Sequence, residues 1–290
     1  MTVSVILPVL NAEKELPAVL QALREQTLQP DEILVVDSSS DDRTAEIARK
    51  SAKVLSVKRE EFDHGKTRDL ALRESAGDIV VFLTQDAVPA GKDFLEQLVK
   101  PLAQDGVAVV TGRQLPKADA TPMERLIRTF NYPEESHVRS EADVARMGIK
   151  AFFCSDVCAA YSRKIYEEIG GFDFPLKTNE DMFFAAKAIR RGYRVAYAAE
   201  AKVYHSHNFS LREQYARNYI QGYEIERHRE LIGEVSQESE GMKLVKFVST
   251  GLLKQGRILS FLHFGFDCIA RFLGSRAGKK AFLRESGKNE

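Results

Sequence analysis

The sequence predicts an α/β fold in which helices flank a mostly parallel central sheet, with a helical extension at the carboxyl end. Short runs of β-branched and apolar residues alternate with amphipathic stretches over the first hundred residues. These runs are apolar throughout, which is typical of parallel strands covered on both faces. The 290 residues, 44% hydrophobic and 29% charged, have the composition of a globular protein with a sizeable core.

The elements follow in order along the amino-terminal half. Helices are predicted where apolar residues recur every three or four positions, as they do at Leu16, Val19, Leu20 and Leu23. The predicted strands cover residues 3–9, 32–37, 53–57, 78–83 and 107–111. The predicted helices cover residues 16–26, 42–52, 66–75 and 92–103.

The carboxyl-terminal half is less regular. Residues 116–150 are polar and show no clear period, so we predict no element there. The elements predicted beyond them are a strand over 151–161, helices over 163–169 and 180–191, a strand over 194–198 and a long polar helix over 211–229. We expect one α/β domain over residues 1–230 and a basic amphipathic helical region over residues 231–290.

The charge and cysteine content limit the classes of partner. The formal net charge is zero, so there is no overall basic excess of the kind that binds nucleic acid. From Lys243 onward, however, ten basic residues face three acidic ones, an excess of +7. The three cysteines make neither a disulfide framework nor a zinc site. Neither a signal peptide nor a membrane span of ~20 apolar residues is predicted, so we expect a cytoplasmic protein.

Polar residues stand at the ends of the predicted strands, where ligands gather in parallel sheets. The loop after the first strand, which includes Asn11, is not rich in glycine, and this argues against a dinucleotide site. Asp37 ends the second strand, where it either binds a base or ribose or only caps the turn. Asp86 follows the fourth strand, and a carboxylate there suits Mg²⁺ or Mn²⁺, which could neutralise two phosphates.

Two helix starts carry further candidates. In the segment FDHGKTR, residues 62–68, Gly65 permits close backbone approach, and Lys66 and Arg68 stand where the positive end of a helix favours phosphate. This pattern suits a diphosphate, and the alternative is a solvated helix start. The segment TNED, residues 178–181, places Glu180 and Asp181 at a second helix start, where acids are common for electrostatic reasons alone.

Taken in order, five segments resemble the family 2 glycosyltransferases of the GT-A fold. They are SVILPVLNAE, EILVVDSSSDDRT, GDIVVFLTQDA, GGFD and NEDMFFAAKAIRRGY. The segments FDHGKTRDLAL and TQDA look most like the bacterial rhamnosyltransferase branch. The resemblance covers residues 2–207. It implies an inverting glycosyltransferase of polysaccharide synthesis, which takes a sugar such as rhamnose from a dTDP- or UDP-sugar with the help of a divalent metal.

The resemblance also implies which residues bind the donor. By motif position, Pro8, Val9 and Asn11 would line the nucleotide pocket, Asp37 would bind the base or ribose, and Arg68 would lie near the base and diphosphate. The other residues that we assign to the nucleotide sugar are His64, Gly65, Lys66, Gln85, Asp86 and Glu180.

The resemblance also implies which residues bind the metal and which residue acts as the base. Asp86 matches the last acid of the family's Asp-x-Asp motif, and Asp181 matches the base of its Glu-Asp motif. The first acid of Asp-x-Asp is Thr84 here, so a single carboxylate remains for the metal and metal binding would be weaker. His205 follows the last predicted strand, with His207 two residues later on the same side, and the pair could bind the metal, contact the diphosphate or be ordinary surface or core histidines. We expect His205 to add an imidazole ligand.

The mechanism implied is a single displacement. Asp181 would take the proton of an acceptor hydroxyl while that oxygen attacks the anomeric carbon from the face opposite the diphosphate, which inverts the configuration. The metal, Lys66 and Arg68 would stabilise charge on the departing diphosphate. A sugar-nucleotide pyrophosphorylase is disfavoured because the first loop is not rich in glycine. A degenerate, non-catalytic nucleotide-sugar or glycan-binding module stays open, since the first acid of the metal motif is missing.

The basic carboxyl-terminal region has two interpretations. Apolar residues interleaved with Lys and Arg suit an interfacial helix on an anionic membrane, where the enzyme would meet a lipid-linked glycan acceptor at the inner face of the cell membrane. The alternative is a set of helices that pack on the catalytic domain or on a second copy in a homo-oligomer.

Overall fold

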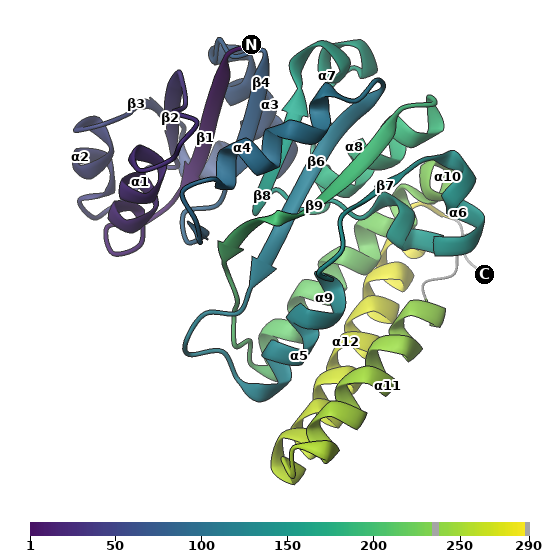
Figure 1. Cartoon of the computed structure of the whole chain (residues 1–290). Coiled ribbons are helices and arrows are strands. Elements are labelled where there is room, and N and C mark those ends of the chain that lie inside the picture. Colours follow the sequence, from purple (N-terminus) through teal and green to yellow (C-terminus); the bar gives the residue numbers. More distant parts are fainter. Residues whose placement is uncertain (234–237, 288–290) are drawn as a thin grey trace.

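One mixed β-sheet forms the centre of the molecule. The structure is a computed structural model and describes residues 1–233 and 238–287. In this part of the chain, nine strands form one sheet in the order β3-β2-β1-β4-β8-β6-β9-β5, and β7 also pairs with β9 (Figure 1). The strands are β1 (Val3–Val9), β2 (Glu32–Asp37), β3 (Lys53–Ser56), β4 (Ile79–Leu83), β5 (Val88–Pro89), β6 (Val107–Leu115), β7 (His137–Arg139), β8 (Cys158–Ser162) and β9 (Arg194–Tyr204).

Helices cover both faces of this sheet, and three long helices follow it. The helices are α1 (Leu16–Arg24), α2 (Thr44–Arg49), α3 (His64–Glu74), α4 (Phe94–Val99), α5 (Pro122–Asn131), α6 (Glu141–Met147), α7 (Arg163–Ile169), α8 (Glu180–Arg190), α9 (Leu211–Arg227), α10 (Arg229–Ile232), α11 (Glu238–Lys254) and α12 (Ile258–Glu285). Short 3-10 turns lie at Arg59–Glu61, Lys100–Ala103 and Gly148–Phe152. The helix predicted over 92–103 is divided, because Pro101 has no N–H to continue α4.

The predicted parallel sheet is confirmed on one side and is mixed on the other. Strands β3, β2, β1 and β4 are parallel neighbours, as are β6 and β9. Strand β8, between β4 and β6, is antiparallel to both, and β5 and β7 are antiparallel to β9. The sequence could not show this, because a short strand buried on both faces has the same pattern in either direction.

The sheet separates two apolar cores. On one face, Val5 and Leu7 of β1 pack with the buried sides of α1, α2 and α4. On the other face, Ile6 packs with residues of α3, α7 and α8. Alternate residues of one strand therefore serve opposite cores, which accounts for the unbroken apolar runs in the sequence.

The segment 116–150, for which we predicted no element, contains α5, β7 and α6. Both helices begin with a capping signal that the sequence carries. The Thr121 side chain accepts the backbone N–H of Glu124 with Pro122 at the first helical position, and Ser140 and Asp143 form a capping box. We missed these helices because we searched for a long apolar period, and each helix is short.

The strand predicted over 151–161 is wrong in its first half. Residues 148–152 form a 3-10 turn, and β8 begins only at Cys158. The guanidinium of Arg139 holds this turn, since it donates to the carbonyl oxygens of Lys150 and Phe153, both at 2.7 Å. The residues after the turn, Ser155 and Asp156, are then free to face the carboxyl edge of the sheet rather than extend it.

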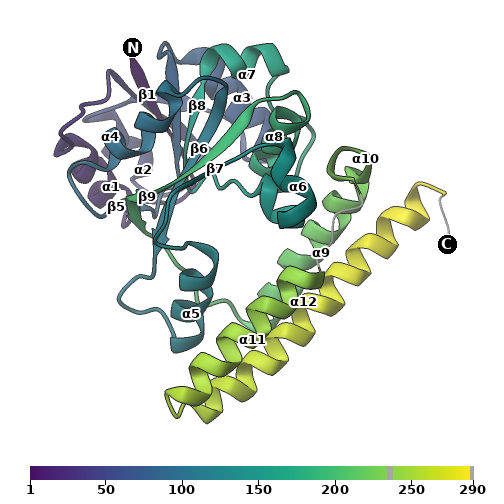
Figure 2. The ribbon, with the colours of Figure 1, turned by 45° about the vertical axis from the view of Figure 1, so that its right-hand side comes forward.

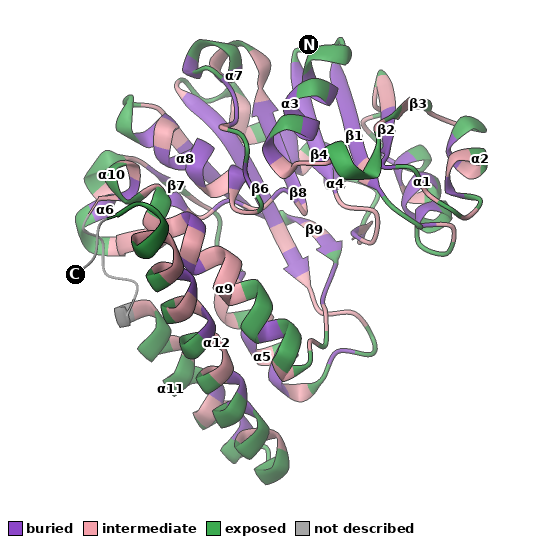
Figure 3. Cartoon of the chain, turned by 180° about the vertical axis from the view of Figure 1, so that it is seen from behind, coloured by how far each residue is buried: buried purple, intermediate pink, exposed green. Residues whose placement is uncertain are grey.

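The carboxyl-terminal helices lie below the sheet (Figure 2). Helix α12 runs along α9, and the two backbones approach closely at Gly222, Gly274 and Gly278, where a Cβ would strike the main chain of the other helix. Helix α11 packs on α5 and α12 through a small core around Val248, Leu252 and Phe264. Figure 3 shows that much of the outer surface of α11 and α12 is exposed.

Candidate active site

The loops after β1 and β2 are tied together at the carboxyl edge of the sheet. Asn11, in the left-handed region with φ of 51°, donates its N–H to Ser40 Oγ at 2.9 Å and accepts the N–H of Asp41 at 2.8 Å. Asp37 is buried and accepts the hydroxyl of Ser40, so it closes the turn after β2. The capping role that we considered for Asp37 is therefore present.

Gln85 joins this pair of loops to the loop after β4. Its side chain accepts the N–H of Leu10 at 2.8 Å and donates to the Leu10 carbonyl at 3.3 Å. The side-chain amide thus both donates to and accepts from the backbone of Leu10, next to Pro8 and Val9. These two hydrogen bonds set the position of the next residue, Asp86, relative to the first strand.

The start of α3 is already occupied by protein groups. The carboxylate of Asp63 accepts the N–H groups of Lys66 at 2.8 Å and Leu176 at 2.6 Å. Gly65 does allow a close approach, but the group that approaches is the carbonyl of Asp173. Lys66 is exposed and His64 is half-buried. Asp63 caps this helix start, where we expected phosphate to gather.

Arg68 lies inside an acidic cluster rather than at the surface. Its guanidinium is 3.2 Å from Asp156 Oδ2 and 3.2 Å from Glu180 Oε1, and all three side chains are buried. Tyr161 donates its hydroxyl to Asp156 Oδ1 at 2.6 Å. Asp156 is a member of the cluster that we did not predict from the sequence.

Asp181 stands at the rim of this cluster, at the start of α8. Its Oδ2 accepts the N–H of Asp156 at 2.9 Å and its Oδ1 accepts the N–H of Met182 at 2.7 Å. Burial, together with the negative charge of Glu180, raises the pKa of Asp181 to about 7. Burial also raises the pKa of Asp156 well above its usual range, with the charge of Asp181 as the second cause.

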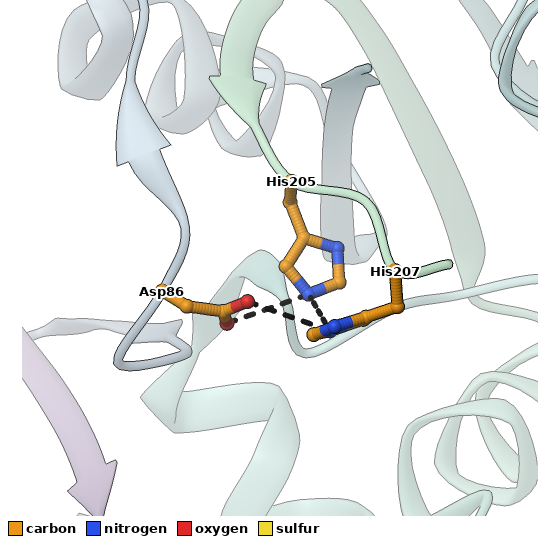
Figure 4. Close-up of side chains that lie close together, drawn as sticks. All are labelled: Asp86, His205 and His207. Carbon is orange, nitrogen blue, oxygen red and sulfur yellow. Dashed lines mark hydrogen bonds and ion pairs between the residues drawn. The ribbon is translucent and has the colours of Figure 1, made fainter. Parts of the chain in front are cut away.

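Asp86 lies among basic side chains, in contrast to Asp181, which lies among acids; Figure 4 shows Asp86 with His205 and His207. The Nε2 atoms of His205 and His207 each lie 3.4 Å from its carboxylate, and Lys117 Nζ lies 2.9 Å from it. Burial by itself would raise the pKa of Asp86, but His205 and Lys117 hold that pKa well below its usual range. The carboxylate is therefore ionised at any physiological pH.

The Asp86, His205 and His207 group can hold a metal ion. Their ligand atoms lie within 4.8 Å of one another. His205 Nδ1 is 2.9 Å from Gln114 Oε1, and with its proton directed to that oxygen the neutral ring would offer the Nε2 lone pair to a metal ion. Burial lowers the pKa of both rings, that of His207 to about 4, so both are neutral at pH 7, as metal ligands must be. Both histidines follow β9 rather than lie in it, yet they face the same carboxylate.

A chain of contacts connects the two acids, and it begins with His205, whose Nε2 lies 3.4 Å from the Asp86 carboxylate. From His205 it runs to Gln114, whose amide nitrogen donates to Ser155 Oγ at 2.9 Å. The residue after Ser155 is Asp156, whose N–H binds Asp181. Gln114 and Lys117 were not predicted as site residues because the fifth predicted strand ended at residue 111, whereas β6 continues to Leu115, and Ser155 fell inside the strand predicted over 151–161.

A cavity lies at the amino edge of the sheet, opposite the carboxyl edge that carries Asp37 and Asp86. It has a volume of about 560 Å³ and is lined by residues near the amino ends of β1, β2 and β3, among them Ser4, Glu32 and Lys53. None of the predicted site residues lines it. In open α/β sheets ligands bind at the carboxyl ends of the strands, so this cavity is not the counterpart of the site described above.

Comparison with known proteins bears on this site. The family model for glycosyl transferase family 2 matches residues 4–170. The O-antigen chain rhamnosyltransferase RfbN of Salmonella typhimurium is 43% identical over 225 residues, 77% of this chain and 72% of the relative. The O-antigen chain rhamnosyltransferase WbaN of Salmonella anatum is 42% identical over 203 residues, 69% of this chain and 64% of the relative.

Solved structures share the fold at lower identity. The mannosyltransferase PcManGT of Pyrobaculum calidifontis, in complex with GDP-Man and Mn²⁺, superposes with a TM-score of 0.63 at 19% identity, over 98% of this chain and 85% of the other. Glucosyl-3-phosphoglycerate synthase of Mycobacterium tuberculosis, in complex with UDP, superposes with a TM-score of 0.57 at 22% identity, over 81% of this chain and 82% of the other.

Proposed function

Because this chain belongs to the family 2 glycosyltransferases and has their GT-A fold, we propose that it is an inverting glycosyltransferase with Asp86 at the metal and Asp181 as the base. One observation carries this proposal. Two carboxyl groups connected by this chain of contacts have pKa values shifted in opposite directions, that of Asp86 downward and that of Asp181 to about 7. Such a divided pair is typical of an acid that stays ionised beside an acid that exchanges protons.

The donor site that we propose lies along the tied loops. Pro8, Val9 and Asn11 line the nucleotide pocket, Asp37 meets the base or ribose, and Gln85 positions the loop that carries Asp86. His64, Gly65, Lys66 and Glu180 complete the donor side. The exposed Lys66 is able to reach a phosphate directly. Arg68, held between Asp156 and Glu180, contributes positive charge from below the surface rather than a direct contact.

We propose Mn²⁺ or Mg²⁺ as the cofactor, held by Asp86 and His205. One carboxylate and neutral imidazole nitrogens form a mixed donor set that fits Mn²⁺ better than Mg²⁺, which prefers oxygen. When bound, the ion supplies positive charge that neutralises the departing diphosphate. Lys117, which contacts the same carboxylate, adds a fixed positive charge there.

In the proposed reaction Asp181 takes the proton of the acceptor hydroxyl. The oxygen forms a bond to the anomeric carbon as the bond from that carbon to the diphosphate breaks on the opposite face, and the electron pair leaves with the diphosphate. The N–H groups of Asp156 and Met182 orient the carboxylate for this transfer. Because this single displacement needs no second, nucleophilic acid, the anomeric configuration is inverted once. The non-catalytic alternative has no support, since a binding module has no use for a carboxyl group poised near neutrality.

The relatives favour a substrate class. Identity of 43% to an O-antigen chain rhamnosyltransferase over most of the chain supports a rhamnosyl donor, dTDP- or UDP-linked, and a growing bacterial polysaccharide as acceptor. The test is a transfer assay with UDP-, dTDP- and GDP-sugars, each with Mn²⁺, Mg²⁺ or EDTA. We expect transfer from one of the donors with inverted anomeric configuration; a product that retains the donor's configuration would contradict the mechanism.

We propose that residues 1–230 catalyse transfer and that residues 231–290 bring the enzyme to an anionic membrane. Exposed apolar side chains form one side of α12: Ile258, Leu259, Leu262, Phe266, Ile269, Phe272 and Leu273. The same side continues with Arg276, Lys280 and Arg284 at helical spacing, all exposed. A second copy docked on this side in parallel would place cations against cations, whereas an anionic lipid surface offsets these charges, and we therefore favour the lipid surface as the partner. Among the described residues, α12 is also the one helix long and apolar enough to cross a membrane.

A further inference from the structure

A cavity of about 190 Å³ lies outside the site described above. Its walls come from the end of α5, from β7, from the turn after α6 and from β9. Phe130, Phe153 and Tyr197 supply aromatic surface. The space is too small for a nucleotide sugar, whose sites are typically ~300 Å³ or larger, and it is large enough for a phosphate or diphosphate with the first atoms attached to it.

The polar lining of this cavity is cationic or neutral. It consists of Asn131, His137, Arg139 and Lys150, with no acidic residue among the lining side chains. Lys150 lies over the ring of Phe130, 4.0 Å from its centroid, and pairs with Glu240 of α11 on its outer side. His137 packs against Tyr197, with their ring centroids 5.2 Å apart.

Arg139 is the unusual member of the lining. It is 2% exposed, and within the described residues no carboxylate lies within ion-pair distance of its guanidinium. Two of its N–H groups donate to backbone carbonyls, while Nε is buried with no partner. Burial lowers the pKa of Arg139 to about 10. Asp143 attracts this charge from beyond ion-pair distance, so the buried guanidinium is incompletely compensated, and an anion in the cavity would offset it.

The position of the cavity connects the two functional regions. On one side, its wall residue Phe153 stands three residues before Asp156, whose N–H holds Asp181. On the other side, Phe130 packs on Phe247 of α11, with their ring centroids 5.5 Å apart, and Lys150 pairs with α11 through Glu240. The cavity therefore borders α11 directly, and the segment 153–156 joins its wall to the residue that holds Asp181.

We propose that this cavity binds the phosphoryl group that links an acceptor glycan to its lipid. In such an acceptor the phosphate or diphosphate stands between sugar and lipid, which matches a cavity that borders α11 and is joined to Asp181 through the segment 153–156. The assignment rests on the proposed function, since it requires a lipid-linked acceptor. Its chemistry is phosphate recognition by Arg139, His137 and Lys150, with the aromatic walls beside the attached chain.

Methionine methyl NMR tests binding directly, because Met147 lines the cavity and Met182 adjoins Asp181. With the donor site saturated by nucleotide, farnesyl diphosphate and inorganic pyrophosphate are titrated separately. We expect both to shift the Met147 methyl signal, with farnesyl diphosphate the tighter ligand by at least tenfold. An unmoved Met147 signal, or a response to pyrophosphate alone, overturns the assignment to a lipid-linked group.

Transfer kinetics give an independent readout. Lys150→Met and His137→Leu should each lower kcat/KM for a prenyl-diphosphate-linked glycan about tenfold, the loss expected for one charge-assisted hydrogen bond, and leave transfer to a soluble glycan unchanged. Arg139→Met is less suitable because Arg139 also holds the turn at 148–152. Arg146→Met, an exposed cation on α6 outside the cavity, is the matched control. Equal losses on both acceptors would refute the cavity and leave the glycosyltransferase function intact.

Discussion

At the scale of single residues, the surroundings rather than the residue type shift the pKa values of the two acids in opposite directions. The Lys117 ammonium lies 2.9 Å from the carboxylate of Asp86 and stabilises its charge. Asp181 shares its surroundings with Glu180 and Asp156, and the nearby cation Arg68 already pairs with both of these acids. Burial among like charges therefore favours the neutral form of Asp181 near pH 7.

The pH dependence of catalysis follows from this. Asp181 must be ionised to accept a proton, so kcat/KM should fall about tenfold per pH unit below an apparent pKa near 7. Asp181→Asn should lower kcat by a factor of about 10² to 10⁴ and remove this acid limb. The measurement is a pH–rate profile of transfer with donor binding followed in parallel. Wild-type turnover by the variant would exclude Asp181 as the base.

The same raised pKa makes the effect of mutation on stability depend on pH. Because the folded-state pKa of Asp181 lies above its unfolded value, its stabilising contribution is present below pH ~4 and is lost as the pH rises through about 7. At every pH, Asp181→Asn also removes one of the two oxygens that accept the N–H groups of Asp156 and Met182, whereas the disfavoured charge that it removes is present only at high pH. The melting temperature of the variant relative to that of the wild type should therefore be higher at pH 8 than at pH 5. Thermal unfolding at both pH values checks this, and a relative melting temperature that is no higher at pH 8 would contradict the electrostatic assignment.

The Mn²⁺ requirement of activity tests whether His205 is a metal ligand. His205→Ala removes a neutral imidazole whose Nε2 lone pair would bind the metal ion, so the Mn²⁺ concentration for half-maximal activity should rise at least tenfold. His263→Ala, an exposed residue of α12, is the control and should not change it. Activity titrated with Mn²⁺ after chelation gives both values, and an unchanged requirement in His205→Ala would remove His205 from the metal site.

At the scale of the elements, glycines determine how α12 lies on α9. Gly274 and Gly278 of α12 face the main chain of α9 so closely that a methyl group has no room. Asp267 is buried on the inner side of α12 and pairs with Arg271 of the same helix at 2.6 Å. The inner side is thus built for contact with protein, while the outer apolar side is left exposed.

Two alanine substitutions in α12 should have opposite effects. Gly278→Ala forces the helices apart and should cost about 1–3 kcal/mol of stability. Gly265→Ala meets open space and should stabilise the helix by up to about 1 kcal/mol, since glycine is a poor helix former. Urea unfolding of both variants measures the difference. Equal stability of the two would show that α9 and α12 do not pack as described.

At the scale of the whole molecule, charge is segregated although the net charge is zero. The excess of +7 from Lys243 onward lies on the same helices as the exposed apolar side of α12. Catalytic residues and this side of α12 belong to different parts of the chain. Substitutions on this side of α12 can therefore change membrane contact without changing catalysis.

Membrane contact can be tested on that basis. Replacement of Leu259, Leu262 and Phe266 by Ser should abolish co-sedimentation with anionic vesicles, because it removes buried apolar area at the lipid surface. Transfer to a soluble acceptor should remain at the wild-type rate. Neutral vesicles and high salt serve as controls for the cationic contribution. If the wild-type protein does not sediment with anionic vesicles and instead forms dimers that the same replacement dissociates, α12 is a contact between copies.

The sequence by itself determined the features that are encoded within about 20 residues. These include the first strands, α7 and α8, the carboxyl edge that carries Asp37 and Asp86, and the family. Apolar period, capping and motif order are local properties, so a single chain is enough to read them. Short elements such as α5, α6 and β7, the start of β8 and its direction were not predicted, because a short segment shows little period and a buried run of five residues carries no mark of its orientation.

The tertiary structure alone decided which charges meet. Lys117 reaches Asp86 across 31 residues, and Arg68 pairs with Asp156 and Glu180 far along the chain, which leaves Asp181 with its raised pKa. The cavity around Arg139 likewise joins four separate segments. Coulomb energy depends on distance in space and on burial, and neither can be computed from position in the sequence. Chemistry at this site therefore became visible only when the folded chain brought these groups together.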